Sequence, residues 1–187
     1  RMERSVRYTL SVKDVSVTTA GEVLVFSGRI YEGENLIVEV TSGFPVRTKK
    51  RVRRQLKTDS AGERTLLRTL EFVTEKRQPY DYAYASGDMN PIHRSVLFAR
   101  VAGFGMNIMH GMCVIGMCER VMINNLTDNE YCLPRAMSGR FSSPVFPGEK
   151  LYIRVFEPRI EGDAKVYEYE AVNARGKVVI RNGKLTV

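Results

Sequence analysis

β-Branched and aromatic residues are abundant in the first quarter of the chain. Residues 5–46 are typical of strands, and the segments richest in such side chains are 22–30 and 36–40. The polar stretch 32–35 lies between these two segments and predicts a hairpin turn. The region contains no histidine and no cluster of reactive side chains. We therefore expect strands here that carry no catalytic residue.

A long apolar run occupies residues 110–126, where Glu119 and Arg120 are the only charged residues. It is shorter than the roughly 20 apolar residues that span a bilayer, so we expect no membrane partner. As a helix it would be about 25 Å long, at ~1.5 Å per residue. Because apolar side chains occur on nearly all of its sides, we expect it to be buried. Its end is predicted by polar residues: Asn124, Asn125 and 127–129.

The remaining hydrophobic pattern predicts strands and short helices on both sides of this run. Residues 65–76 fit a strand or a helix, and we favour a strand, followed by a short helix or turn around 79–85. Residues 95–104 predict a short helix that ends at Gly103 and Gly105. Four β-like segments joined by short turns then favour an antiparallel meander: 135–142, 150–156, 165–172 and 177–187.

Candidate chemistry gathers in one polar cluster, and the chain's only two histidines, His93 and His110, lie in or near it. The cluster consists of Ser86, Gly87, Asp88, Asn90, Pro91 and His93. Glycine and proline shape the path from Asp88 to His93, which favours a turn that points a carboxylate and an imidazole at one spot. Such a pair on one water is a workable general acid–base arrangement, typically contributing about 10²–10⁴-fold. The alternative is ordinary turn chemistry, because Asp and Asn hydrogen-bond their own backbone.

The start of the predicted central helix is a second candidate site. The first turn of a helix has unpaired N–H groups and a partial positive charge. A ligand oxygen can approach the N–H of Gly111 closely, because this residue has no side chain, and a thioester oxyanion would be stabilised there. The alternative is that Gly111 and Gly116 only permit close packing against a sheet.

These motifs together resemble the MaoC-like dehydratases, the family of the R-specific enoyl-CoA hydratases. The resemblance lies in Tyr82-Ala83, Ser86–His93, Ala102-Gly103-Phe104 and Ile108–Met112, and covers about 45 residues directly. It implies a hot-dog fold of the α+β class, in which an antiparallel sheet wraps a central helix. It also implies reversible hydration of trans-2-enoyl thioesters to (3R)-3-hydroxyacyl thioesters in fatty acid metabolism.

The same resemblance assigns roles to individual residues. The family's catalytic Asp and His match Asp88 and His93, and its oxyanion-hole glycine matches Gly111. We expect the other motif residues to bind substrate: Asn90, Ser86, His110 and Met112. The segment 95–104 would overhang the site. Two departures, Arg94-Ser95 where many members have Asp, and Asn107 and Met109 where many have Pro and Ala, bear on acyl-chain preference more than on the reaction.

Some 80 residues precede the motif, which in a single hot-dog hydratase lies near the start. Residues 1–58 therefore look like the strand half of a preceding hot dog without a catalytic motif, and residues 59–187 like the hydratase domain. This suggests a reduced double hot dog. The alternatives are that the first segment enlarges a single sheet or pairs across a dimer.

Charge and cysteine content limit the partners. The net charge is +8, and the basic run 47–57 is typical of a solvated segment or of a surface that meets phosphates. Acyl-CoA or an acyl carrier protein fits this charge, while nucleic-acid-binding motifs are missing. Cys113, Cys118 and Cys132 form no disulfide framework and lack zinc spacing, so we expect a reducing, cytoplasmic location and no metal.

The leading hypothesis is thus a hydro-lyase that acts on CoA or phosphopantetheine thioesters without a cofactor, with a homodimer expected by analogy with other hot dogs. Two alternatives stay open. One is a non-catalytic module that binds acyl-CoA or an acyl carrier, and the other is a hot-dog thioesterase.

Overall fold

The computed structural model describes residues 5–18, 21–46, 64–127 and 133–187. Their contacts divide the chain into two compact units, Arg1–Ala61 and Gly62–Val187. The basic run 47–57 and Cys132 lie outside the described residues.

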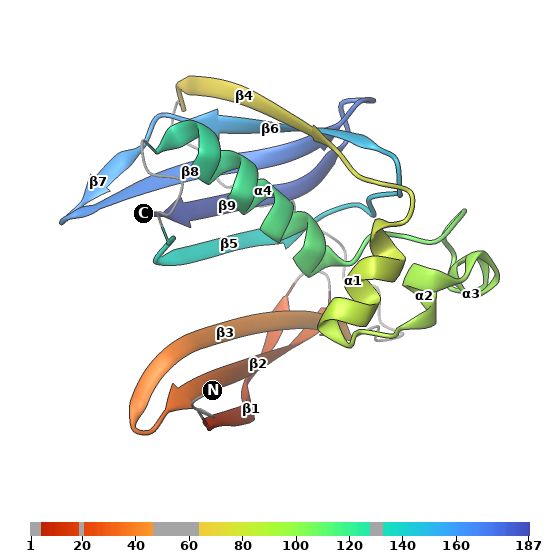
Figure 1. Ribbon diagram of the computed structural model, residues 1–187, viewed down its shortest axis with the longest axis horizontal. Helices are drawn as coiled ribbons and strands as arrows, with labels where there is room; N and C mark the ends of the chain where they lie inside the picture. Colours follow the sequence, from red (N-terminus) through yellow and green to blue (C-terminus); the bar gives the residue numbers. More distant parts are fainter. Residues whose placement is uncertain (1–4, 19–20, 47–63, 128–132) are drawn as a thin grey trace. The chain divides into compact units, whose positions relative to one another are not determined.

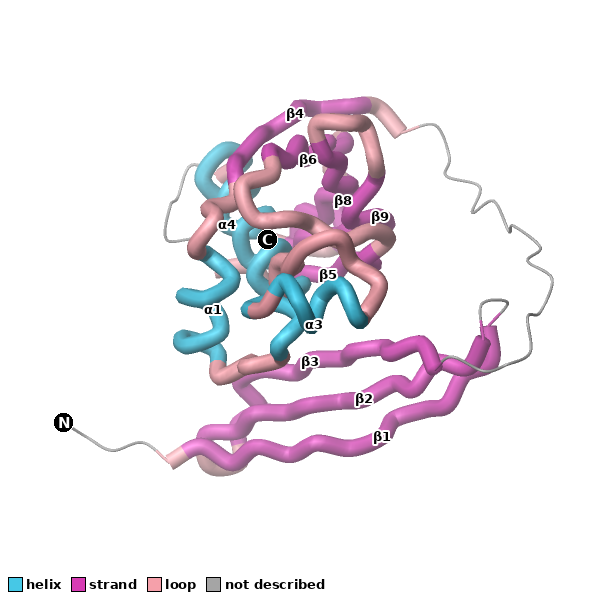
Figure 2. Tube along the Cα trace, turned by 90° about the vertical axis from the view of Figure 1, so that its right-hand side faces the viewer, coloured by secondary structure: helices cyan, strands magenta, loops and turns pink. Residues whose placement is uncertain are grey.

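The N-terminal unit is one antiparallel sheet with the strand order β1-β2-β3 (Figure 2). Its strands are β1 (Val6–Thr18), β2 (Gly21–Glu32) and β3 (Asn35–Val46). The expected hairpin turn joins β2 to β3, and Gly33 adopts a φ of 59° there, which residues with a Cβ rarely do. The prediction of strands across residues 5–46 is confirmed.

One face of this sheet is apolar along all three strands. The pairing places Tyr8 opposite Ile30, and Ile30 opposite Val38, so these side chains share a face. Large apolar side chains on β1 and β3 are nevertheless more than 40% exposed: Tyr8, Leu10, Val12, Val38, Val40 and Phe44. No helix belongs to the described part of this unit.

The C-terminal unit is a six-stranded antiparallel sheet crossed by one long helix (Figure 1). Its strand order is β4-β6-β8-β9-β5, and β7 pairs with β8. The strands are β4 (Leu66–Val73), β5 (Ala136–Phe141), β6 (Lys150–Phe156), β7 (Arg159–Glu161), β8 (Ala164–Asn173) and β9 (Val178–Thr186). Three short helices gather beyond the N-terminal end of the long one: α1 (Gln78–Ser86), α2 (Pro91–Arg94) and α3 (Val96–Val101).

The strand order corrects the simple meander expected from the sequence. The strand β5 does not pair with β6, which follows it in the chain, but lies at the edge of the sheet and pairs with β9. The connection from β5 to β6 therefore crosses the sheet. The short strand β7 was not expected, because its three residues carry no distinctive pattern.

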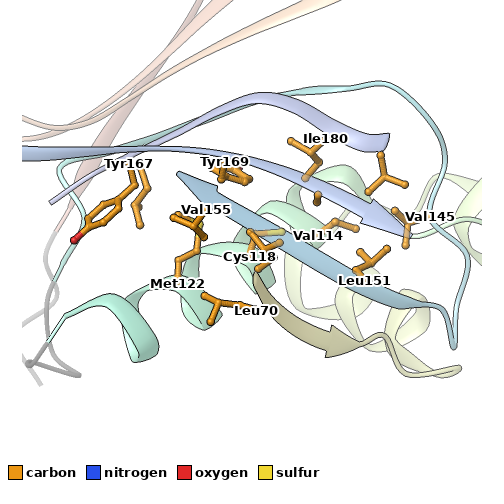
Figure 3. Close-up of a cluster of buried hydrophobic side chains, with 14 of the residues drawn as sticks. Leu70, Val114, Cys118, Met122, Val145, Leu151, Val155, Tyr167, Tyr169 and Ile180 are labelled. Carbon is orange, nitrogen blue, oxygen red and sulfur yellow. The ribbon is translucent and has the colours of Figure 1, made fainter. Parts of the chain in front are cut away.

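The long helix α4 (Gly111–Leu126) packs on the sheet through one face. Figure 3 shows Val114, Cys118 and Met122 of this helix directed at side chains of the sheet. The core they enter includes Leu151, Ile153, Val155, Tyr169 and Ile180, all fully buried. An antiparallel sheet wrapped around a central helix is the hot-dog fold, so the predicted α+β class is confirmed.

The expectation that α4 is buried all round was wrong. Residues at a spacing of four form an exposed stripe along it: Met112, Gly116, Arg120 and Asn124. A spacing of four keeps residues on one side of a helix, so the stripe faces away from the sheet. Of the described helices, none combines the length and apolar character needed to cross a membrane.

Candidate functional site

The polar cluster begins where α1 ends. Gly87 closes the helix in the left-handed conformation, with a φ of 76°, and its N–H donates to the carbonyl of Ala83 at 2.9 Å. The hydroxyl of Ser86 donates to the carbonyl of Tyr82 at 2.7 Å and accepts from the N–H of Asp88 at 3.2 Å. The chain therefore leaves α1 in a fixed direction at Asp88.

Asn90 and Pro91 turn the chain back into the short helix α2. The Oδ1 of Asp88 accepts from the N–H of Asn90 at 3.2 Å, and the Oδ1 of Asn90 accepts from the N–H of Ile92 at 3.3 Å. Asn90 thus caps α2, and Pro91 occupies its first turn, where its missing N–H costs nothing. The turn chemistry is present, and it leaves Asp88 exposed while it carries His93 inward to 7% exposure.

The tautomer of His93 follows from its backbone contact. Its Nδ1 lies 2.9 Å from the carbonyl oxygen of Ile108, which can only accept, so Nδ1 carries the proton. The neutral ring then keeps a lone pair on Nε2. Burial lowers the pKa of His93 below its ordinary value, against the smaller raising effects of the Ile108 hydrogen bond and Asp88. His93 is therefore held as a neutral base.

His110, the residue before α4, lies against His93. The two rings stack with their centroids 3.8 Å apart and their planes 26° apart. The Nε2 of His110 donates to the peptide carbonyl of Asp88 at 3.0 Å, while its buried Nδ1 finds no hydrogen-bond partner among the described residues. The ring of Tyr82 lies 4.9 Å from that of His110. His110 thus contacts both members of the predicted dyad.

Asp88, His93 and His110 are the described residues that could hold a metal ion. One ligand atom from each lies within 4.8 Å of those from the other two. However, stacked imidazole rings direct their lone pairs along nearly parallel planes, so both cannot aim at one ion without moving apart.

Gly111 begins α4 and follows His110 directly. Within a helix the N–H groups of its first turn lack carbonyl partners, so the amide of Gly111 remains available to an oxyanion next to the dyad. A Cβ on Gly111 would meet the Cζ of Phe141 at 2.8 Å. A Cβ at this position would therefore force the half-exposed ring of Phe141 to shift. Gly116, in contrast, faces open space, so the packing role considered for it is wrong.

The sequence did not indicate the segment that joins these parts. The buried Asn107 donates from Nδ2 to the carbonyl of His93 at 3.0 Å, and the N–H of Ile108 donates to the carbonyl of Ile92 at 3.2 Å. The sequence relates Asn107 to acyl preference, whereas in the structure its side chain holds the backbone of His93. The one sequence signal for this role was the polar side chain of Asn107 close to the apolar run 110–126.

The residues expected to bind substrate have different surroundings. The side chains of Ser86 and Asn90 shape the turn, and His110 is buried at 2% exposure. Met112 is 56% exposed on the open stripe of α4. Their contacts with substrate stay predictions.

Comparison with known proteins places this site in a family. The family model of the MaoC like domain matches residues 46–177. The chain is 38% identical over 99 residues to peroxisomal multifunctional enzyme type 2 of Mus musculus, an alignment that covers 52% of this chain and 13% of that one. It is 37% identical over 95 residues to peroxisomal enoyl-CoA hydratase 2 of Arabidopsis thaliana, which covers 51% of this chain and 29% of the relative.

A solved structure extends the likeness to nearly the whole chain. Full-length peroxisomal multifunctional enzyme type 2 from Drosophila melanogaster superposes with a TM-score of 0.76 at 26% identity, over 96% of this chain and 33% of that one. This chain therefore spans a third or less of the length of these relatives. Because the family model covers most of the chain and includes the whole Asp88–Gly111 site, the chain belongs to the MaoC-like domain family.

Proposed function

We propose that the chain catalyses the reversible addition of water to trans-2-enoyl thioesters, which gives (3R)-3-hydroxyacyl thioesters. One observation carries the proposal: the Asp88 carboxylate lies close to a neutral His93, beside the free amides that open α4. The names of the relatives, enoyl-CoA hydratase 2 among them, agree with this chemistry.

The reaction uses only groups of this chain and one water. Asp88 and the Nε2 lone pair of His93 hold the water, and the pair takes a proton from it as its oxygen bonds to C3. The negative charge that develops on the thioester oxygen is stabilised by the N–H of Gly111. The pair then returns a proton to C2, which completes the addition of water. This sequence requires neither a metal nor an organic cofactor.

Loss of either dyad member should abolish most of the activity. We would follow crotonyl-CoA hydration by the enoyl absorbance in wild type, Asp88→Asn and His93→Gln, and expect kcat to fall by about 10²–10⁴-fold in both. Asp163→Asn is the matched control, since Asp163 is an exposed carboxylate paired with Arg135 at 2.7 Å. Wild-type rates in folded Asp88→Asn and His93→Gln would refute the dyad.

The same assay separates the two alternative functions. A thioesterase would release free CoA, which a thiol reagent detects, and the described cysteines Cys113 and Cys118 are buried and give little background. A binding module would bind acyl-CoA calorimetrically without turnover at any chain length. The assembled acid–base pair favours the hydratase over both.

The carrier of the acyl group is CoA or an acyl carrier protein in this proposal. Both present phosphopantetheine, and the net charge of +8 suits either. Comparison of kcat/KM for one enoyl group on CoA and on a carrier protein would distinguish them. A series of enoyl-CoA chain lengths would then define the acyl preference.

We also propose that the N-terminal unit is the strand half of another hot dog and that the protein works as a homodimer. The exposed apolar face that Tyr8, Leu10 and Val40 share supports the first idea, because a hot-dog sheet covers a helix with such a face. Light scattering of the purified chain tests the dimer. Replacement of Leu10 and Val40 by Thr tests the face, since full stability would argue against its burial in the working protein.

The location of the protein remains part of the proposal. Free, buried Cys113 and Cys118 suit a reducing compartment such as the cytoplasm, while the relatives cited above are named peroxisomal. Fractionation of cells that express the tagged protein would decide between the two.

A further inference from the structure

We infer that His110 is a positioning residue that aligns Asp88 and His93 with the amide of Gly111, and not a residue that binds substrate. The inference rests on the proposed hydratase function. It starts from two contacts of one side chain: a hydrogen bond to the peptide of Asp88 and a stack on the ring of His93.

The hydrogen bond fixes the acid. The Nε2–H of His110 donates to the carbonyl of Asp88 at 3.0 Å, so the backbone that bears the carboxylate is attached to the residue before α4. Asp88 is itself exposed and lies between helices, in a stretch without regular structure. A donor that holds its peptide therefore restricts the direction of the carboxylate more than it would inside a helix.

The stack fixes the base. The Nδ1 of His93 donates a hydrogen bond to the carbonyl of Ile108. The ring can then misplace its Nε2 mainly by rotation about the side-chain bonds of His93. The ring of His110, 3.8 Å away between centroids, occupies the space into which the ring of His93 would turn. His110 and Gly111 are adjacent in sequence. His110 therefore sets the positions of both Asp88 and His93 relative to the amide of Gly111.

His110 offers substrate little to bind. The residue is 2% exposed, its Nε2 is occupied by the carbonyl of Asp88, and its buried Nδ1 has no hydrogen-bond partner among the described residues. A buried polar atom without a partner is costly, so its retention calls for an explanation, which the two contacts of His110 supply. The hydrogen bonds therefore place a proton on opposite ring nitrogens of the two residues: Nδ1 of His93 and Nε2 of His110.

The test uses His110→Phe, which keeps a flat ring and removes the donor, and His110→Gln, which keeps a donor and removes the aromatic ring. Asn124→Ala, on the exposed stripe of α4, is the control. We expect kcat for enoyl-CoA hydration to fall by about 10–100-fold in both His110 variants, with KM nearly unchanged, as small misplacements of reacting groups produce. A higher KM with wild-type kcat, or no change in either folded variant, would overturn the inference.

Nuclear magnetic resonance tests it without any assay. The chain has only two histidines, so ¹⁵N spectra of the wild type should show two imidazoles of opposite tautomer, and His110→Phe should retain only that of His93. The carbonyl ¹³C resonance of Asp88 should shift in His110→Phe and stay in place in Asn124→Ala. Equal tautomers or an unmoved Asp88 carbonyl would contradict positioning, whereas an inactive wild type with these spectra would reject only the proposed reaction.

Discussion

The ring of Phe141 lies against the backbone of Gly111, so that a methyl group on Gly111 would come within 2.8 Å of the ring. The strand β5 and the first residue of α4 therefore meet at the amide proposed to receive the oxyanion. Since Phe141 is 47% exposed, its ring borders both the helix and solvent.

This contact predicts that Gly111→Ala overpacks the junction. We expect a loss of about 1–3 kcal/mol in the free energy of unfolding, measured by urea denaturation. Phe141→Ala should remove the clash, so the double variant should be more stable than the sum of the two single changes predicts. Strict additivity in the double-mutant cycle would show that the ring and the glycine do not press on each other.

The lowered pKa of His93 predicts how activity depends on pH. The proposed base must be neutral, so kcat/KM should hold down to pH 6.5 and fall only below it. In the same window, stability should fall with falling pH, because the unfolded chain binds a proton near pH 6.5 and the folded chain does so only at lower pH. Titration of the His93 ring by NMR measures the value, and a pKa above 6.5 would contradict the proposed burial effect.

Asn107→Ala should destabilise the protein and slow catalysis together. Its amide is buried and donates to the carbonyl of His93, so its removal leaves a buried acceptor unpaired at a cost of about 1–3 kcal/mol. Asn125→Ala is a matched control, since its amide donates to the carbonyl of Val121 at 2.8 Å on the exposed side of α4. In thermal melts, Asn107→Ala should lower the melting temperature clearly more than Asn125→Ala does. Equal losses of stability would mean that burial of the hydrogen bond is unimportant.

Removal of metal should leave activity unchanged. The stacked rings of His93 and His110 could not both bind one ion without moving apart, and the proposed steps need no metal. We would compare initial hydration rates before and after dialysis against a chelator, with metal analysis of the same samples. Activity that disappears on chelation and returns with a divalent ion would assign a metal to Asp88 and the two imidazoles.

The sequence predicted what depends on local pattern and on motifs. The strands of residues 5–46, the hairpin at Gly33 and the helix that starts at Gly111 follow from residue types and short-range turn signals. The resemblance supplied the hot-dog fold. Asp88 and His93 were singled out because a carboxylate and an imidazole flank a proline turn, and the structure brings them together.

The sequence could not predict contacts between distant residues. The pairing of β5 with β9 depends on how the chain crosses the sheet, which no local pattern specifies. The exposed stripe of α4 was missed because Met112 and Gly116 are apolar or small yet face away from the sheet. The stack of His110 on His93 joins residues 17 positions apart, and only the folded α2 places them together.

Within the described part of the chain, the hydrogen bonds of Asp88, His93 and His110 all connect residues between positions 86 and 114. The arrangement of these three residues is thus set within one short continuous segment, while the sheet strands come from elsewhere in the chain. A side chain on a strand can therefore change without altering a hydrogen bond of the proposed acid–base pair.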